Sequence, residues 1–161
     1  MDFDVPPMSS QRKVLFVCLG NVCRSPAAEV IFRTFAEKRN LQIEVASCGL
    51  ADWNAGRMPD QRMCDVALEH GFDLKNVRSQ PFKMEFFEDY DWIFAADKRI
   101  LEALQRGCPK EYVTKLHLFT AFSSKHRNLD VPDPYVGQEE TFERVIEMIE
   151  DACLGIVEEM R

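Results

Sequence analysis

The segment from Cys18 to Pro26 (Cys-Leu-Gly-Asn-Val-Cys-Arg-Ser-Pro) constrains this chain more than any other feature. The apolar, valine-rich run from Val14 to Val17 leads into Cys18 and predicts a buried strand. Pro26 suits the first turn of a helix, so a helix is expected to begin directly after the loop. A strand, a tight loop and a helix N-terminus in this order direct amides and the positive end of a helix dipole at one point. That point suits a phosphate dianion.

Three residues of the segment have the chemistry for phosphoryl transfer. Cys18 is the expected nucleophile, because the loop amides, the helix dipole and Arg24 all favour its reactive thiolate form. Arg24 carries a planar set of donors that matches two phosphoryl oxygens. Ser25 can donate a hydrogen bond to the thiolate when it attacks and when it leaves. A lone cysteine at a strand end is more often a small buried hydrophobe, and only the complete segment outweighs that reading.

Two further loop residues are interpreted through their backbone. Gly20 lets the chain approach a ligand closely or adopt a positive φ. Asn21 tolerates a left-handed conformation and can hold the loop together with its side-chain amide.

The chain of 161 residues is expected to form one domain from residue 11 to residue 161, after a loose extension over residues 1–10. Its net charge of −7 makes nucleic acid and anionic membranes poor partners. No apolar run approaches the roughly 20 residues of a membrane span. The six cysteines lack metal-binding spacing, so neither a metal nor another cofactor is expected, and free thiols in a reducing cytoplasm are.

Strand and helix patterns alternate along the chain. This order predicts a doubly wound α/β domain of three layers, a parallel sheet with helices on both faces. Cys18 then lies at the carboxyl end of a strand, where such sheets bind ligands. The expected strands are Arg12–Cys18, Gln42–Ser47, Asp91–Ala96 and Val113–Leu118. The expected helices are Pro26–Arg39, a helix that runs from its cap Asp60 to His70, a short helix or turn over Phe82–Tyr90, Lys98–Arg106 and Gln138–Arg161. Asp97 is expected to cap the helix Lys98–Arg106.

Transfer through a cysteine also requires an acid that protonates the leaving oxygen and later activates water. Asp133 is the preferred candidate, because Pro132 and Pro134 hold it in stiff, extended backbone. Taken alone, it would more often be a turn or capping aspartate. Asp130 is a weaker candidate, since it lacks a proline on each side.

At these residues the chain resembles the low-molecular-weight protein tyrosine phosphatase family. The matching segments are Val14 to Pro26, followed by Ala28-Glu29, and Asp133-Pro-Tyr-Val-Gly137. The resemblance implies a four-stranded parallel sheet, with Cys18 as nucleophile, Arg24 and Ser25 as its partners, and Asp133 as acid and then base. It implies phosphotyrosine proteins as substrates, and phosphate or vanadate as inhibitors. The loop residues expected to contact substrate are Leu19, Gly20, Asn21, Val22 and Cys23.

The same resemblance suggests three residues outside the loop. Trp53 and Tyr135 look like the two aromatic walls of the substrate cleft, whose faces would grip a phenyl ring. Asn21 and His70 look like a polar pair that braces the loop. Val136 stands where many eukaryotic members carry a second tyrosine, so regulatory phosphorylation is not expected there.

Three other functions could use a similar loop. Arsenate reductases of the same fold need two further thiols, and the third strand ends in Phe94-Ala-Ala-Asp97 without a cysteine. Protein-arginine phosphatases tend to carry threonine where this chain has Val22, which favours phosphotyrosine. A phosphate-binding module without activity would have lost Cys18, Arg24 or Asp133, and all three are present.

Cys23 suggests redox control of the same loop. Oxidised Cys18 would first be a sulfenic acid, which condenses readily with a nearby thiol. A Cys18–Cys23 disulfide would protect the nucleophile from irreversible oxidation. The alternative is that Cys23 only packs beneath the loop.

Overall fold

The computed structural model describes residues 12–134 and 139–161, without the side chains of residues 139–140. The expected extension over residues 1–10 and the aromatic wall at Tyr135 lie outside the described residues. Four parallel strands form one sheet in the order β2-β1-β3-β4. The strands are β1 (Arg12–Cys18), β2 (Ile43–Gly49), β3 (Trp92–Ala95) and β4 (Leu116–Leu118).

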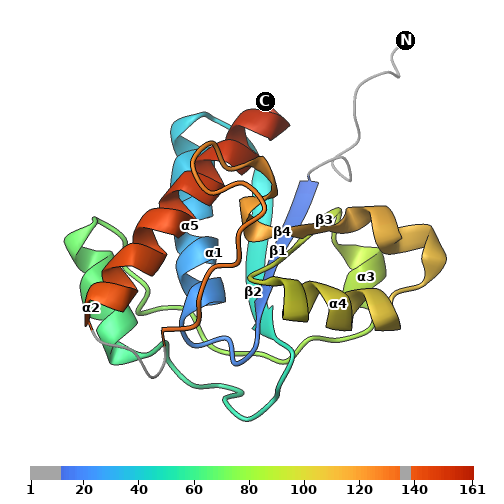
Figure 1. Ribbon diagram of the computed structural model, residues 1–161, viewed down its shortest axis with the longest axis horizontal. Coiled ribbons are helices and arrows are strands. Elements are labelled where there is room, and N and C mark those ends of the chain that lie inside the picture. The colour runs from blue at the N-terminus through green and yellow to red at the C-terminus, as the bar shows by residue number, and fades with distance from the viewer. Residues whose placement is uncertain (1–11, 135–138) are drawn as a thin grey trace.

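Helices cover both faces of the sheet, which confirms the doubly wound α/β prediction (Figure 1). On one side, α1 packs against β1, β2 and the long C-terminal helix α5, and α5 also contacts α2. On the other side, α4 contacts β3 and β4. Among the described helices, none is long and apolar enough to cross a membrane. The helices are α1 (Arg24–Lys38), α2 (Gln61–Glu69), the short α3 (Phe86–Asp89), α4 (Lys98–Gly107) and α5 (Glu139–Met160).

The central strand β1 explains why this sheet is buried on both faces. Because side chains alternate along a strand, Val14 and Phe16 enter the core beneath α1 and α5, whereas Leu15 and Val17 enter the core on the α3–α4 side. Phe16 contacts the aromatic rings of Phe32, Phe94 and Phe119, with centroids 5.3–5.7 Å away. Truncating such a buried phenylalanine to alanine typically costs about 3–5 kcal/mol.

The predicted strand Val113–Leu118 is wrong over its first half. Residues Lys110–Lys115 form a 3₁₀ helix, and only Leu116–Leu118 are strand. The reason lies in the sheet: β4 is an edge strand that pairs with β3 alone, and only three residues of β3 have partners there. If this register continued, Val113 and Thr114 would extend beyond the start of β3 at Trp92.

The other boundaries differ slightly from the sequence prediction. Helix α1 begins two residues early, at Arg24, so the expected anion-binding residues Arg24 and Ser25 already belong to its first turn. Helices α2 and α4 are capped as expected: Asp60 accepts from the Arg62 amide, and Asp97 accepts from the Ile100 amide. The loops after β1 and β2 and the segment after residue 129 come together at the bottom of Figure 1.

Candidate active site

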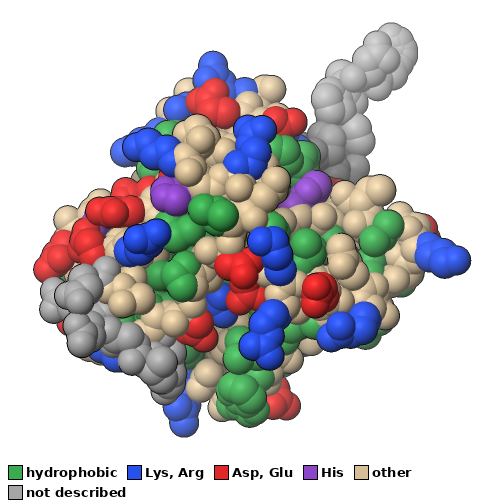
Figure 2. All heavy atoms as spheres, in the orientation of Figure 1, with side chains coloured by type: hydrophobic (Ala, Val, Ile, Leu, Met, Phe, Trp, Pro, Cys, Tyr) green, Lys and Arg blue, Asp and Glu red, His purple; other side chains and the backbone are tan. Residues whose placement is uncertain are grey.

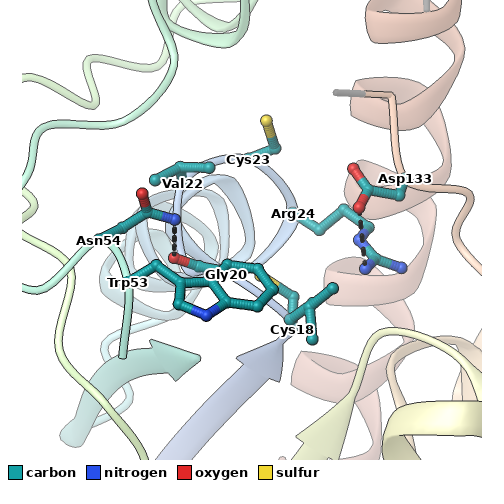
Figure 3. Close-up of a pocket in the computed structure, with 9 residues that line it drawn as sticks. Cys18, Gly20, Val22, Cys23, Arg24, Trp53, Asn54 and Asp133 are labelled. Carbon is teal, nitrogen blue, oxygen red and sulfur yellow. Dashed lines mark hydrogen bonds and ion pairs between the residues drawn. The ribbon is translucent and has the colours of Figure 1, made fainter. Parts of the chain in front are cut away.

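A pocket opens at the carboxyl end of β1, where the sequence places Cys18. Figure 3 shows the residues that line it, drawn from the loop after β1, the loop after β2 and the segment before α5. The structure thus brings Cys18, Arg24, Trp53 and Asp133 to one pocket. The lining residues are Cys18, Leu19, Gly20, Val22, Cys23, Arg24, Trp53, Asn54 and Asp133.

Cys18 is 3% exposed, and its sulfur has two polar neighbours. The Asn21 amide donates to Sγ at 3.2 Å, and Ser25 Oγ lies 3.0 Å from Sγ. Ser25 Oγ also accepts a hydrogen bond from Asn21 Nδ2 at 2.7 Å, so its own proton is free to point at Sγ or at the Cys48 carbonyl, 3.3 Å away. A hydroxyl held in this way is suited to stabilising a thiolate.

The loop leaves several amides without protein acceptors. In the described part of the chain, the amides of Gly20, Val22, Cys23 and Arg24 donate to no carbonyl and no side chain. The N-cap residue Cys23 offers α1 no side-chain hydrogen bond either. Unpaired amides at a helix N-terminus form a ready anion site, because their partial positive charges add to the helix dipole.

Asn21 holds this loop in shape. Its φ of 57° is left-handed, as its residue type allows. Its Nδ2 donates to Ser47 Oγ at 3.1 Å as well as to Ser25, and its Oδ1 accepts from the Gln80 amide at 2.9 Å. Ser79 Oγ donates to the Asn21 carbonyl at 2.5 Å. Asn21 is therefore fixed by three elements: α1, β2 and the segment before α3.

His70 does not brace this loop, which corrects the expected pairing of Asn21 with His70. Its Nδ1 lies 2.9 Å from Glu150, and its Nε2 contacts Glu143, so both ring nitrogens bind α5 instead. As the C-cap of α2, His70 lies at the end of that helix next to α5. The hydrogen bonds to Asn21 that were expected from His70 are made instead by Ser47, Ser79 and Gln80. No pattern in the sequence indicated these three residues.

Arg24 is 3% exposed and reaches the pocket from the first turn of α1. Its Nη1 donates to Asp97 Oδ2 at 2.7 Å and to the Val131 carbonyl at 2.8 Å. Burial opposes the guanidinium charge, but the Cys18 thiolate, Asp97 and Asp133 outweigh it and raise the pKa of Arg24 above its ordinary value. Asp97 was not predicted in this position, because its role as a helix cap already explained an aspartate there.

Asp133 lies at the mouth of the pocket, 46% exposed, with Oδ2 3.7 Å from Arg24 Nη2 (Figure 3). Its segment is fixed at Val131, which is buried and donates its amide to the Ala96 carbonyl at the end of β3. Asp130 points elsewhere: its Oδ1 accepts from the Lys98 amide at 2.9 Å, at the start of α4. The geometry thus favours Asp133 over Asp130 as the acid.

Two residues of the loop after β2 shape the rim. Trp53 is 69% exposed and lines the pocket, and its role as an aromatic wall stays a prediction. Asn54, which the sequence analysis missed, donates from Nδ2 to the Gly20 carbonyl at 3.1 Å. A Cβ on Gly20 would lie 2.8 Å from that nitrogen, so a larger residue at this position would displace the Asn54 side chain.

Cys23 lies in the same loop, but its sulfur points away from Cys18 (Figure 3). Burial raises the pKa of the Cys23 thiol far above its ordinary value, and the neighbouring charges of Asp60, Cys18 and Asp133 add to this effect. In this conformation Cys23 is a protonated, packed thiol. A Cys18–Cys23 disulfide therefore requires the loop to rearrange, and its formation remains a prediction.

An anion-binding loop with a cysteine at its base, an arginine beside it and a carboxylate at its mouth defines a class: phosphatases that use a thiolate. Comparisons with known proteins place the chain within that class. The family described as low molecular weight phosphotyrosine protein phosphatase matches residues 13–161. The chain belongs to this family, which confirms the resemblance seen in the sequence, and it is a hydrolase of phosphoric monoesters.

Individual relatives cover almost the whole chain. A low molecular weight protein-tyrosine-phosphatase of Streptomyces coelicolor is 37% identical, over 92% of this chain and 93% of that protein. The low molecular weight phosphotyrosine protein phosphatase of Sus scrofa is 34% identical, over 93% and 96%. Among solved structures, a protein tyrosine phosphatase of Entamoeba histolytica superposes with a TM-score of 0.89 at 35% identity, covering 93% of this chain and 97% of that one.

Proposed function

We propose that this protein hydrolyses phosphotyrosine in proteins, and small aryl phosphates, through a phosphocysteine intermediate on Cys18. The observation that carries the proposal is the position of Cys18 Sγ, which lies at the base of an anion-binding loop with Ser25 Oγ 3.0 Å away. Arg24 and Asp133 line the same pocket, where Arg24 can bind the non-bridging oxygens of a phosphoryl group and Asp133 can serve its leaving oxygen.

The first step is phosphoryl transfer to the enzyme. The free loop amides and the Arg24 guanidinium bind the three non-bridging oxygens, which places phosphorus above Sγ. The thiolate attacks phosphorus, a P–S bond forms, and the bond from phosphorus to the phenolic oxygen breaks. Asp133, protonated, gives its proton to that oxygen, so that neutral tyrosine leaves.

The second step releases phosphate. Asp133, now a carboxylate, accepts a proton from water, and the water oxygen attacks phosphorus. The P–S bond breaks, and Cys18 leaves as a thiolate that Ser25 and the Asn21 amide stabilise. Asp97 and the Val131 carbonyl keep Arg24 in place during both steps, since they hold the Nη1 end of its guanidinium.

The substrate ring is proposed to lie against Trp53, whose exposed face lines the pocket. Tyr135 is proposed as the opposite wall. Val22 also lines the pocket and has no hydroxyl, which supports phosphotyrosine over the phosphoarginine alternative. All six cysteines are free thiols, which supports a reducing, cytoplasmic location.

The test is a set of hydrolysis rates. Wild-type protein should hydrolyse p-nitrophenyl phosphate and a phosphotyrosine peptide with a chelator present, and a phosphoarginine peptide more slowly. Cys18→Ser should lose turnover but still bind vanadate or phosphate. A higher rate on phosphoarginine would favour the alternative substrate, and appreciable turnover by Cys18→Ser would exclude Cys18 as nucleophile.

A further inference from the structure

A second groove opens beside the catalytic pocket, on the side of α4. The two cavities share Leu19, Arg24 and Asp133 as a common wall. The groove is also the larger, at about 410 Å³ against about 160 Å³ for the catalytic pocket. A peptide whose phosphotyrosine occupies the catalytic pocket therefore has room for a neighbouring side chain in the groove.

Two arginines of α4, Arg99 and Arg106, line this groove. They are seven residues apart, so they lie on the same face of the helix, two turns from each other. Both side chains are exposed, and neither guanidinium has a hydrogen bond or an ion pair within residues 12–134 and 139–161. By contrast, Arg33 and Arg39 each pair with a glutamate.

The acidic residues of the groove do not neutralise this pair. Both oxygens of Asp97 are engaged, since Oδ2 accepts from Arg24 and Oδ1 accepts from the Ile100 amide. Glu102 stands between the arginines along α4, but it forms no ion pair with either one in the described structure. Asp133, the third acidic residue that lines the groove, lies with its Oδ2 3.7 Å from Arg24 Nη2. Figure 2 shows Lys and Arg side chains interspersed with acidic ones on the surface over α4.

Arg99 does not stabilise α4 itself. It lies in the first turn of α4, where the helix dipole disfavours a positive charge, and this turn holds no acidic residue. The whole chain carries a net charge of −7. Two exposed arginines without ion-pair partners in the described structure therefore form a positive site on a negatively charged protein. Residues that oppose local stability in this way are expected mainly at functional sites.

We propose that the groove is a specificity subsite that binds the carboxylate of an acidic residue next to the phosphotyrosine of the substrate. Arg99 and Arg106 supply the charge-assisted hydrogen bonds, and Leu19 separates the subsite from the catalytic pocket. This inference rests on the proposed phosphotyrosine phosphatase activity. It assigns Arg99 and Arg106 to substrate selection and leaves the chemistry to Cys18, Arg24 and Asp133.

The test compares three substrates: a phosphotyrosine peptide flanked by glutamates, the same peptide with glutamines, and p-nitrophenyl phosphate. Wild-type protein should prefer the glutamate peptide in kcat/KM. The double variant Arg99→Gln/Arg106→Gln should lose about 5- to 10-fold on that peptide, mainly through KM, because exposed ion pairs are each worth little. Its rates on the other two substrates should stay within about 2-fold, since they carry no flanking charge.

Lys83→Gln/Lys110→Gln is the matched control, because it removes the same charge from exposed sites outside the groove. It should retain the preference for glutamate. The inference is overturned if wild type shows no such preference, if the arginine variant keeps it, or if that variant loses equally on all three substrates. Hydrolysis of p-nitrophenyl phosphate separates these outcomes from failure of the proposed function, which would abolish activity on every substrate.

Discussion

Arg24 Nη1 donates to Asp97 Oδ2 at 2.7 Å, and this ion pair joins the first turn of α1 to the residue that caps α4. The two residues are 73 positions apart in the sequence. They meet because they follow β1 and β3, which are neighbouring strands of the sheet. Asp97 therefore ties the expected phosphate-binding group to the opposite face of the fold. We therefore expect Asp97 to act as a positioning residue, through Arg24 and not on the phosphoryl group itself.

Asp97→Asn should lower kcat/KM on p-nitrophenyl phosphate by about 100-fold, because a displaced Arg24 no longer meets the phosphoryl oxygens correctly. Asparagine caps helices as well as aspartate does, so α4 should persist. Vanadate binding should weaken in parallel. Asp130→Asn is the control, since Asp130 also binds the start of α4 but not Arg24, and it should stay close to wild type. Unchanged kcat/KM in Asp97→Asn would remove the positioning role.

Asp133→Asn should slow substrates with poor leaving groups far more than substrates with good ones. A phenolate of high basicity needs a proton in the transition state, and acid catalysis is worth about 10²–10⁴-fold. A series of substituted aryl phosphates measures this dependence directly. An equal loss across the series would make Asp133 a structural residue. The acid would then have to be sought at Asp130.

Much of the fold and site followed from local sequence chemistry. The strand Arg12–Cys18 and the caps Asp60 and Asp97 depend on short patterns, and these predictions were confirmed. The length of β4 could not be read in this way, because it depends on which residues of β3 offer a partner.

The hydrogen bonds that hold the loop after β1 in shape could not be predicted from the sequence. Asn21 meets Ser47, Ser79 and Gln80 only through tertiary contacts, and isolated serines carry no sequence signal. His70 was placed by resemblance to the family and binds α5 instead.

Cys23→Ser should recover less activity than wild type when a dithiol reductant is added after a peroxide pulse. The reason is that only wild type can trap oxidised Cys18 as a disulfide before irreversible oxidation. Because the Cys23 thiol is buried, with a raised pKa, and turned away, the disulfide should form slowly and only as the loop rearranges. Mass spectrometry should find a Cys18–Cys23 peptide. Equal recovery without that peptide would leave Cys23 a packing residue.

His70 should make the stability of the α2–α5 contact depend on pH. Burial lowers its pKa, but the hydrogen bonds that the Glu143 and Glu150 carboxylates accept from the protonated ring outweigh burial and raise the pKa above its ordinary value. A raised folded-state pKa stabilises the fold fully below the unfolded value of about 6.5, and this contribution is lost as pH rises through the folded value. The advantage of wild type over His70→Gln in free energy of unfolding should therefore shrink from about pH 6 to about pH 8.

His117 provides a contrast of opposite sign. Burial lowers its pKa, so protonation opposes folding, and the advantage of wild type over His117→Gln should grow as pH rises toward the unfolded value of about 6.5 and stay level above it. Urea unfolding of the three proteins at several pH values measures both trends. A pH-independent difference for His70→Gln would show that its contacts with α5 carry no charge.

The central claim is that Cys18 carries the phosphoryl group between substrate and water. Asp133→Asn is the variant in which to observe it, because without the base the intermediate should accumulate on a substrate with a good leaving group. Rapid acid quenching during turnover of p-nitrophenyl phosphate, followed by peptide mass spectrometry, locates the covalent phosphate. We predict phosphate on Cys18 and none when Cys18→Ser is added to the variant. Phosphate on another residue, or release of nitrophenol with no covalent phosphate at any time, would contradict the mechanism.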